Sequence, residues 1–313
     1  MDKRVRADIA LGFCTLLWGV TFVVVKSALG YASVFLFLAV RFSLATIVMV
    51  GFRPQVLARL KRVEVLAGAA LGLFMFGGYA FQTAGLQYTT AAKSGFVTGS
   101  SVVMVPLLLG LFWRRQLSAW AYIGALAAVV GLYFLTVPAE GVAHLNRGDL
   151  FTLVAAALYA IHIILVSEYT QKHSVSALSV IQIAACAMFA WLAAETAGVF
   201  GWQPQRFPWR WELYAAVAIC AIFATALAFS MQLWAQQYTT PGHAAILFTL
   251  EPVVAVVTSY LVLGERLGSR SLLGAVFVFG GILLAEWLGP PAVPESPEPV
   301  FQGRIYFELW WRL

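Results

Sequence analysis

Apolar residues form runs of about 20 that recur along nearly the whole chain, separated by short polar segments. A helix of about 20 residues crosses the roughly 30 Å hydrocarbon core of a bilayer, whereas strands of a membrane barrel alternate apolar and polar residues. Because lipid cannot bond the backbone, runs that are apolar on every face predict spanning helices. The pattern predicts ten of them, at Ile9–Leu29, Ser33–Phe52, Glu64–Leu86, Ala91–Trp113, Ala119–Val137, Asp149–Tyr169, Ser176–Gly198, Glu212–Gln236, Gly242–Leu263 and Ser271–Leu288.

A signal peptide is the alternative interpretation of the first run, since residues 28–30 resemble a weak cleavage site. We favour a retained helix, because the run is long and because the sixth run looks like its partner. Trp18 and Thr21 of the first run, and Asp8 directly before it, align on Tyr159, His162 and Asp149 of the sixth.

A long repeat divides the chain into two halves. The segment Gln87–Leu117 recurs without a gap 150 residues later, at Gln237–Leu267. A long-period duplication in an apolar chain is typical of a transporter built from two halves. The identical positions over 82–135, each with its partner 150 residues further on, are Gln82, Gln87, Tyr88, Thr89, Thr90, Val103, Leu111, Leu117, Gly124, Ala125 and Gly131.

Five helices per half is an odd number, so the second half is expected to enter the membrane upside down relative to the first. We therefore expect an all-α integral membrane protein in which two inverted five-helix repeats surround a central cavity. The first repeat covers residues 1–140 and the second 145–289. A proline-rich tail follows over 290–313, and its last residues, 300–313, are either a native amphipathic segment or partly an expression remnant.

Lysine and arginine in the short loops favour a cytoplasmic N-terminus by ten to five, and an even number of spans returns the C-terminus to the same side. We expect a multi-pass protein of the bacterial inner membrane. The side of the N-terminus carries Lys3, Arg4, Arg6, Arg53, Arg59, Lys61, Arg62, Arg114, Arg115 and Lys172, and the opposite side carries Arg147, Arg206, Arg210, Arg266 and Arg270.

Composition narrows the function. The chain is 61% hydrophobic and 11% charged. Its net charge of +6 does not indicate binding to nucleic acid, because the basic residues lie between the spans. The three cysteines fall inside predicted spans, so neither a disulfide framework nor a metal spacing is expected. The chain holds no phosphate-binding loop, no HExxH and no nucleophile elbow. We expect a protein that is not an enzyme and needs no cofactor or metal.

Several motifs resemble one known family. LLWGVTFVVVKSAL (16–29) and AVRFSLATIV (39–48) resemble the first two helices of the EamA type of the drug/metabolite transporter superfamily, and GLQYTTAAKSGFVTGSSVVMVPLL (85–108) and LEPVVAVVTSYLVLGERL (250–267) resemble later signatures. The similarity covers about residues 7–288 and is greatest to bacterial exporters of amino acids, including aromatic ones. It implies ten helices, export of small metabolites and alternating access. One departure is Trp113-Arg114-Arg115, where the second half has Leu263-Gly264-Glu265.

Ionisable groups within spans are costly and are candidates for function. Lys93 and His243 follow the paired Thr-Thr by three residues in their respective halves, and a cation there suits a substrate carboxylate. The alternative for Lys93 is a side chain that reaches the interface. Glu251 precedes a proline in mid-span and is expected to bind a proton or a substrate amine, or to be a structural partner of Arg41. Pro106 is expected to interrupt the fourth helix.

Aromatic and amide side chains complete the candidate site. Trp18 and Thr21 share one face of the first helix, as Tyr159 and His162 do on the sixth, and such faces suit a polar cavity that holds an apolar side chain. Ordinary helix packing explains them about as well. Four further residues are expected near the repeated motif, where they either bind the ammonium and carboxylate groups of a substrate or form hydrogen bonds between helices: Tyr79, Gln82, Gln232 and Trp234.

The repeat and the sparse polar groups predict a secondary transporter, and the resemblance implies that it exports amino acids, aromatic or otherwise neutral, and related small metabolites by alternating access. Its partners are then a small-molecule substrate and the lipid bilayer, and a monomer is compatible with the sequence. The alternatives are a broader drug or nucleotide-sugar transporter, a membrane-embedded lipid-modifying enzyme, and a sensor that binds without flux.

Overall fold

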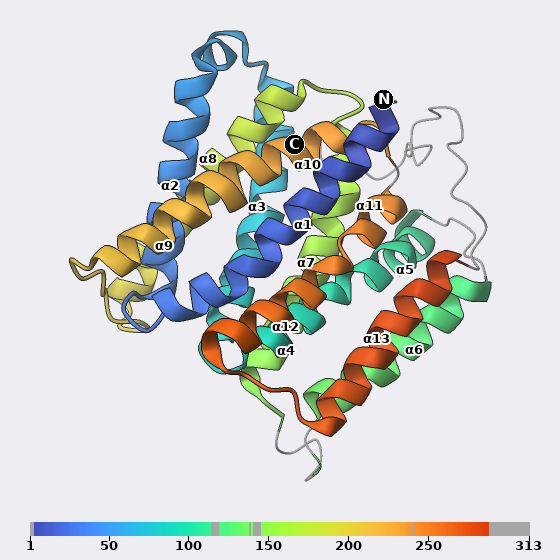
Figure 1. Cartoon of the computed structure of the whole chain (residues 1–313). Helices are drawn as coiled ribbons and strands as arrows, with labels where there is room; N and C mark the ends of the chain where they lie inside the picture. The colour runs from blue at the N-terminus through green and yellow to red at the C-terminus, as the bar shows by residue number, and fades with distance from the viewer. Residues whose placement is uncertain (1–2, 114–118, 138, 140–144, 240, 288–313) are drawn as a thin grey trace.

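The computed structural model describes residues 3–113, 119–137, 139, 145–239 and 241–287. All regular elements in this part of the chain are helical (Figure 1). The predicted tail over 290–313 and the basic residues 114–115 lie outside it. The elements are α1 (Lys3–Ala28), α2 (Val34–Phe52), the 3₁₀-helix η1 (Pro54–Arg59), α3 (Arg62–Leu86), α4 (Ala91–Gly99), α5 (Ser101–Trp113), α6 (Ala119–Thr136), α7 (Arg147–Tyr169), α8 (Val175–Val199), α9 (Trp211–Ala221), the π-helix η3 (Ile222–Leu227), α10 (Ala228–Ala235), α11 (Pro241–Leu247), α12 (Leu250–Leu263) and α13 (Ser269–Trp287).

Seven helical stretches of the described chain are long and apolar enough to cross a membrane. They are Lys3–Ala28, Val34–Phe52, Arg62–Leu86, Ala91–Phe112, Arg147–Tyr169, Val175–Val199 and Trp211–Ala235. Shorter apolar helices cover Tyr122–Thr136, Leu250–Leu263 and Ser269–Gly281. Large apolar side chains such as Ile47 and Leu261 lie on the outside, 69% and 72% exposed, as contact with lipid requires. A multi-pass helical membrane protein is confirmed, whereas the count of ten helices and the inversion of the second half stay predictions.

The fourth predicted helix is broken, but not where the sequence suggested. Pro106 lies inside α5 without ending it, so the expected interruption at this proline is wrong. The chain breaks at Ser100 instead, between α4 and α5. Glycine at position 99 is a poor helix former, and the Ser100 hydroxyl donates to the Val97 carbonyl at 2.6 Å, which competes with the helical bonds.

Two more predicted helices are irregular. The eighth contains the π-helix η3 between α9 and α10, and the ninth is divided into α11 and α12. Non-helical or strained backbone at membrane depth is tolerated where protein buries it or where it lines a cavity. The three irregular segments therefore mark the part of the molecule in which a site is expected.

Helices from the two halves of the sequence interleave. α1 packs on α12, α3 on α7 and α8, α2 on α8, and α6 on α13. Small residues permit these approaches: a Cβ added to Gly68, Gly72 or Gly95 would lie 2.6–2.7 Å from the Cβ of Ile181, Ala185 or Ala255. Because helices of both halves pack on each other, their side chains can enclose a common space.

Candidate functional site

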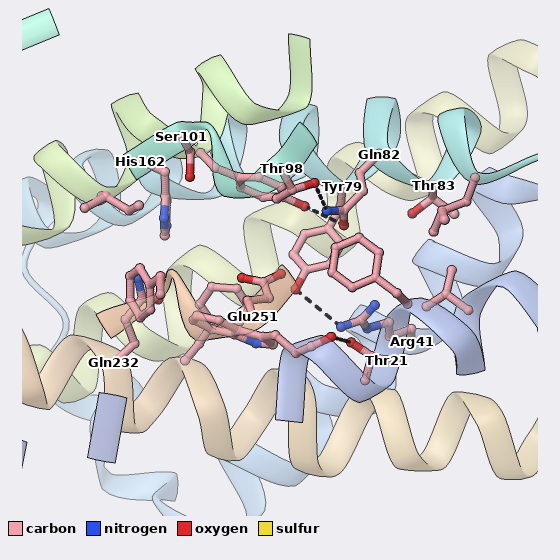
Figure 2. A pocket seen from close by; sticks show the side chains of 18 residues that line it. Thr21, Arg41, Tyr79, Gln82, Thr83, Thr98, Ser101, His162, Gln232 and Glu251 are labelled. Atoms are coloured by element: carbon pink, nitrogen blue, oxygen red, sulfur yellow. Dashed lines mark hydrogen bonds between the residues drawn. The ribbon is translucent and has the colours of Figure 1, made fainter. Parts of the chain in front are cut away.

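A cavity lies among helices of both halves, and Figure 2 shows its side chains. Nine of the twelve residues singled out from the sequence line it: Trp18, Thr21, Arg41, Tyr79, Gln82, Tyr159, His162, Gln232 and Glu251. The remaining lining residues are Phe22, Val25, Thr83, Leu86, Thr98, Ser101, Ile163, Phe229 and Phe248. The structure thus brings together side chains that are more than 200 residues apart in the sequence.

The π-helix η3 supplies acceptors to two of these side chains. The Ala224 carbonyl accepts a hydrogen bond from Nε1 of Trp18 at 2.9 Å, and the Thr225 hydroxyl accepts one from Nε of Arg41 at 3.0 Å. A π-helical turn disturbs the regular backbone bonding and is frequent at functional sites. Here it fixes the orientation of one aromatic ring and one guanidinium.

Arg41 on α2 is a buried cation, only 1% exposed. Its Nη2 lies 3.4 Å from the Tyr79 hydroxyl, and its guanidinium lies 4.6 Å and 5.4 Å from the ring centres of Tyr79 and Phe42. These contacts replace part of the lost hydration of the charge. Among the described residues no carboxylate lies within ion-pair distance of Arg41, so Arg41 and Glu251 form no direct ion pair in this structure.

Glu251 lies in the first turn of α12 and faces the cavity. A carboxylate is favourable at a helix N-terminus, and Pro252 is tolerated there because the first turn needs no backbone donor. Within the described chain the carboxylate of Glu251 accepts no hydrogen bond and forms no ion pair. The break before α12 thus places an unpaired carboxyl group in the cavity wall.

Aromatic rings form the apolar part of the wall. Trp18 lies 5.2 Å from Phe229 and 5.4 Å from Phe248 between ring centres, and Tyr79 lies 5.6 Å from Tyr159. These distances are typical of edge and tilted aromatic contacts. The rings offer a surface on which an apolar side chain of a substrate can pack.

Hydrogen bonds fix the amides of the upper wall in Figure 2. Gln82 donates from Nε2 to the Thr98 hydroxyl at 2.9 Å and accepts at Oε1 from the Tyr159 hydroxyl at 3.2 Å. His162 lies 3.1 Å from Oε1 of Gln182, which lies outside the cavity lining. In contrast, Oε1 of Gln232 is buried without a partner.

Three predicted site residues are not among those that line the cavity. Lys93 lies 3.7 Å from Oδ2 of Asp149, and His243 lies 3.1 Å from Oδ1 of Asp8. Trp234 packs on Tyr238 at 5.5 Å between ring centres and belongs to the apolar packing around α10. These three side chains therefore do not belong to the wall of this cavity.

Several lining residues were not predicted from the sequence. Thr98 and Ser101 flank the break between α4 and α5, which the sequence did not predict at this position. Phe229 follows η3, a π-helix for which the sequence gives no clear signal. Thr83 follows Gln82 along α3, so the neighbouring amide was the available signal.

Residues 6–137 and 146–287 each match the EamA-like transporter family. The chain therefore belongs to this family, and the resemblance noted from its motifs is confirmed. It is a membrane protein of a transporter family.

Individual relatives agree with this class. The chain is 34% identical over 284 residues to an uncharacterized transporter of Archaeoglobus fulgidus, which covers 91% of this chain and 87% of that protein. It is 27% identical over 254 residues to the threonine/homoserine exporter RhtA of Escherichia coli, 79% of each chain. A solved crystal structure covers 90% of this chain and 96% of its own with a TM-score of 0.65 and 19% identity, which is a likeness of fold alone.

Proposed function

We propose that the protein exports amino acids, aromatic or otherwise neutral, and related small metabolites by alternating access. The observation that carries the proposal is the composition of the cavity wall. Amide, hydroxyl and charged groups able to bind a polar head stand beside the rings of Trp18, Tyr79, Tyr159 and Phe229, which suit an apolar side chain. The relation to a threonine/homoserine exporter supports this substrate class.

The contacts at the two ends of α1 and α7 support alternation. The end of α1 and the start of α7 meet the first repeated motif: Lys26 donates to the Thr89 carbonyl at 2.5 Å, and the Thr89 hydroxyl donates to Asp149 at 2.5 Å. The start of α1 and the end of α7 meet the second motif, through Lys3 over the Tyr238 ring and Gln237 bonded to Thr170. The two copies of the motif therefore lie at opposite ends of these helices.

The two ends are not equivalent. Asp149 at the first end is buried and bonded to Thr89, whereas the side chain of Asp8 at the second end is 31% exposed. The Thr239 hydroxyl, equivalent to that of Thr89, is buried without a hydrogen-bond partner. One tight end and one looser end are what a protein is expected to have when it opens its central cavity to one side at a time.

Further parts of the proposal come from the sequence pattern. The two stretches that match one family model, 6–137 and 146–287, support the proposed division into two inverted five-helix repeats over 1–140 and 145–289. The basic loops favour a bacterial inner-membrane protein with both termini in the cytoplasm. A monomer with a small-molecule substrate is sufficient for such a mechanism.

Reconstitution tests the proposal directly. Proteoliposomes loaded with unlabelled amino acid are expected to accumulate the same labelled amino acid by counterflow, with L-threonine, L-homoserine and L-phenylalanine as the first panel. Tyr159→Ala is expected to reduce counterflow, because it removes both a cavity ring and the donor to Gln82. Absence of counterflow for every neutral amino acid would contradict the proposed substrate class.

A further inference from the structure

We infer that the cavity contains a binding site for a primary ammonium group, formed by the carboxylate of Glu251 and the amide oxygen of Gln232, with Arg41 receiving the carboxylate of the same substrate. The inference deepens the proposed function and rests on it. It specifies the ligand class as a zwitterion with a free amine and a free acid, and it assigns an orientation to that ligand.

The first observation is the unused bonding capacity of Glu251. Its carboxylate lines the cavity, yet within the described chain it has no hydrogen-bond donor and no cation as a partner. A carboxylate that is neither paired nor hydrogen-bonded is expensive at membrane depth and marks a place where a cation or proton binds. The carboxylate of Glu251 is therefore free to accept hydrogen bonds from a ligand.

The second observation is independent of the first. Oε1 of Gln232, on α10, is buried with no hydrogen-bond partner, although most buried amide oxygens in proteins have one. Gln232 lines the same cavity as Glu251 (Figure 2). Two acceptors without donors fit an ammonium group, which carries three N–H donors and no acceptor.

The third observation is the separation of opposite charges. Arg41 and Glu251 both line the cavity but do not form an ion pair. In Figure 2 Glu251 lies between Gln232 on one side and Arg41 on the other. An arrangement with acceptors toward one end and a guanidinium toward the other matches an amino acid whose ammonium and carboxylate point to opposite ends. The aromatic rings that line the same cavity then receive its side chain.

The ligand class gives the first test, on the unmodified protein. Purified full-length protein in proteoliposomes is assayed by counterflow of labelled L-phenylalanine and L-threonine, with competition by the N-acetyl derivative, which lacks the ammonium, and by the amide of the carboxyl group. We expect the parent amino acids to compete and the N-acetyl derivatives to compete at least tenfold less well. N-acetyl derivatives that compete as well as the parents would overturn the inference.

Substitutions give the second test. Glu251→Gln and Gln232→Met are each expected to weaken the apparent affinity for the amino acid, Glu251→Gln by about tenfold or more because it removes a charge-assisted bond. The fold-loss of affinity in the double variant is expected to be smaller than the product of the two single fold-losses, since both groups bind one ammonium. Glu195→Gln and Gln203→Met are matched controls that do not line the cavity and are expected to transport normally. Thermal unfolding of each variant identifies any loss of folding. Glu251→Asp, which keeps the charge, is measured in the same way.

The outcomes separate the inference from the function on which it depends. If no neutral amino acid is moved, the proposed function fails and the inference fails with it. If amino acids are moved and Glu251→Gln alters only transport driven by a pH gradient, with counterflow affinity unchanged, Glu251 is a proton site and the inference alone is wrong. If counterflow affinity falls for both cavity variants and not for the controls, the ammonium site is supported.

Discussion

Gly131 of α6 and Gly274 of α13 meet backbone to backbone. A Cβ placed on either glycine would lie 2.6 Å from the carbonyl oxygen of the other, and a Cβ on Gly281 would lie 2.6 Å from the carbonyl of Gly124. In the sequence repeat Gly124 corresponds to Gly274 and Gly131 to Gly281. Exchanging each glycine for its equivalent therefore turns the first contact into the second. This is the pairing expected when two copies of one unit are related by a half-turn, and it supports the proposed inversion.

This contact predicts a stability effect. Gly131→Val adds a Cβ and two methyl groups that clash with backbone atoms of α13, and these atoms cannot rotate away. We therefore expect the substitution to destabilise the α6–α13 pair by about 1–3 kcal/mol. The melting temperature in detergent measures the loss. Gly280→Ala, on α13 with no atom within 4 Å of its added Cβ, is the matched control and is expected to melt like the parent. Equal melting temperatures for the two variants would contradict the close approach.

Arg41 predicts a combined loss of stability and transport. Arg41→Met leaves the Thr225 hydroxyl and the Tyr79 phenol without their donor and removes the cation from the cavity. We expect destabilisation by about 1–3 kcal/mol and counterflow below one tenth of the parent rate. Arg41→Lys is not expected to restore transport, because an ammonium cannot reproduce the planar contacts with Tyr79 and Thr225. Full activity of the lysine variant would show that charge alone is sufficient.

Much of this architecture could be predicted from the sequence, and the failures have physical causes. Apolar length predicted the spans because the bilayer imposes it, and the equivalence of Trp18 with Tyr159 predicted two walls of one cavity. Lys93 and His243 were predicted to bind a substrate carboxylate, but a sequence does not show that Asp149 and Asp8 lie beside them. The break at Ser100 was missed because a proline, at position 106, seemed the stronger signal, although neighbouring helices stabilise α5 around it.

The Lys93–Asp149 contact predicts coupling between two residues of different halves. Asp149 is fully buried, so Lys93→Met leaves a carboxylate whose remaining hydrogen bond comes from Thr89. We expect Lys93→Met to destabilise the protein by about 2 kcal/mol, and the double variant Lys93→Met with Asp149→Asn to recover part of that loss. Denaturant unfolding or melting temperatures of the four proteins give the coupling energy. Strict additivity would show that the two side chains do not interact.

The two repeated motifs predict cross-links that exclude each other. Tyr88 and Asn146 adjoin at the first end, where Nδ2 of Asn146 donates to the Tyr88 carbonyl at 2.7 Å. The equivalent positions at the second end are Tyr238 and Val5, by the repeat and by the alignment of Asp8 with Asp149. Cysteines are introduced at each pair, in a background where the native cysteines are replaced by alanine, and are joined by a short bis-thiol reagent that a reductant releases.

If the ends open in turn, either cross-link alone is expected to stop counterflow, and reduction is expected to restore it. In a protein carrying both pairs, formation of the first cross-link is expected to prevent the second, because closing one end opens the other. Mass spectrometry of intact protein counts the cross-links in each molecule. Single cysteines at 88 and 238, treated in the same way, control for modification alone and are expected to keep their activity. Molecules that carry both cross-links, or that transport normally while cross-linked at one end, would rule out alternation between these two ends.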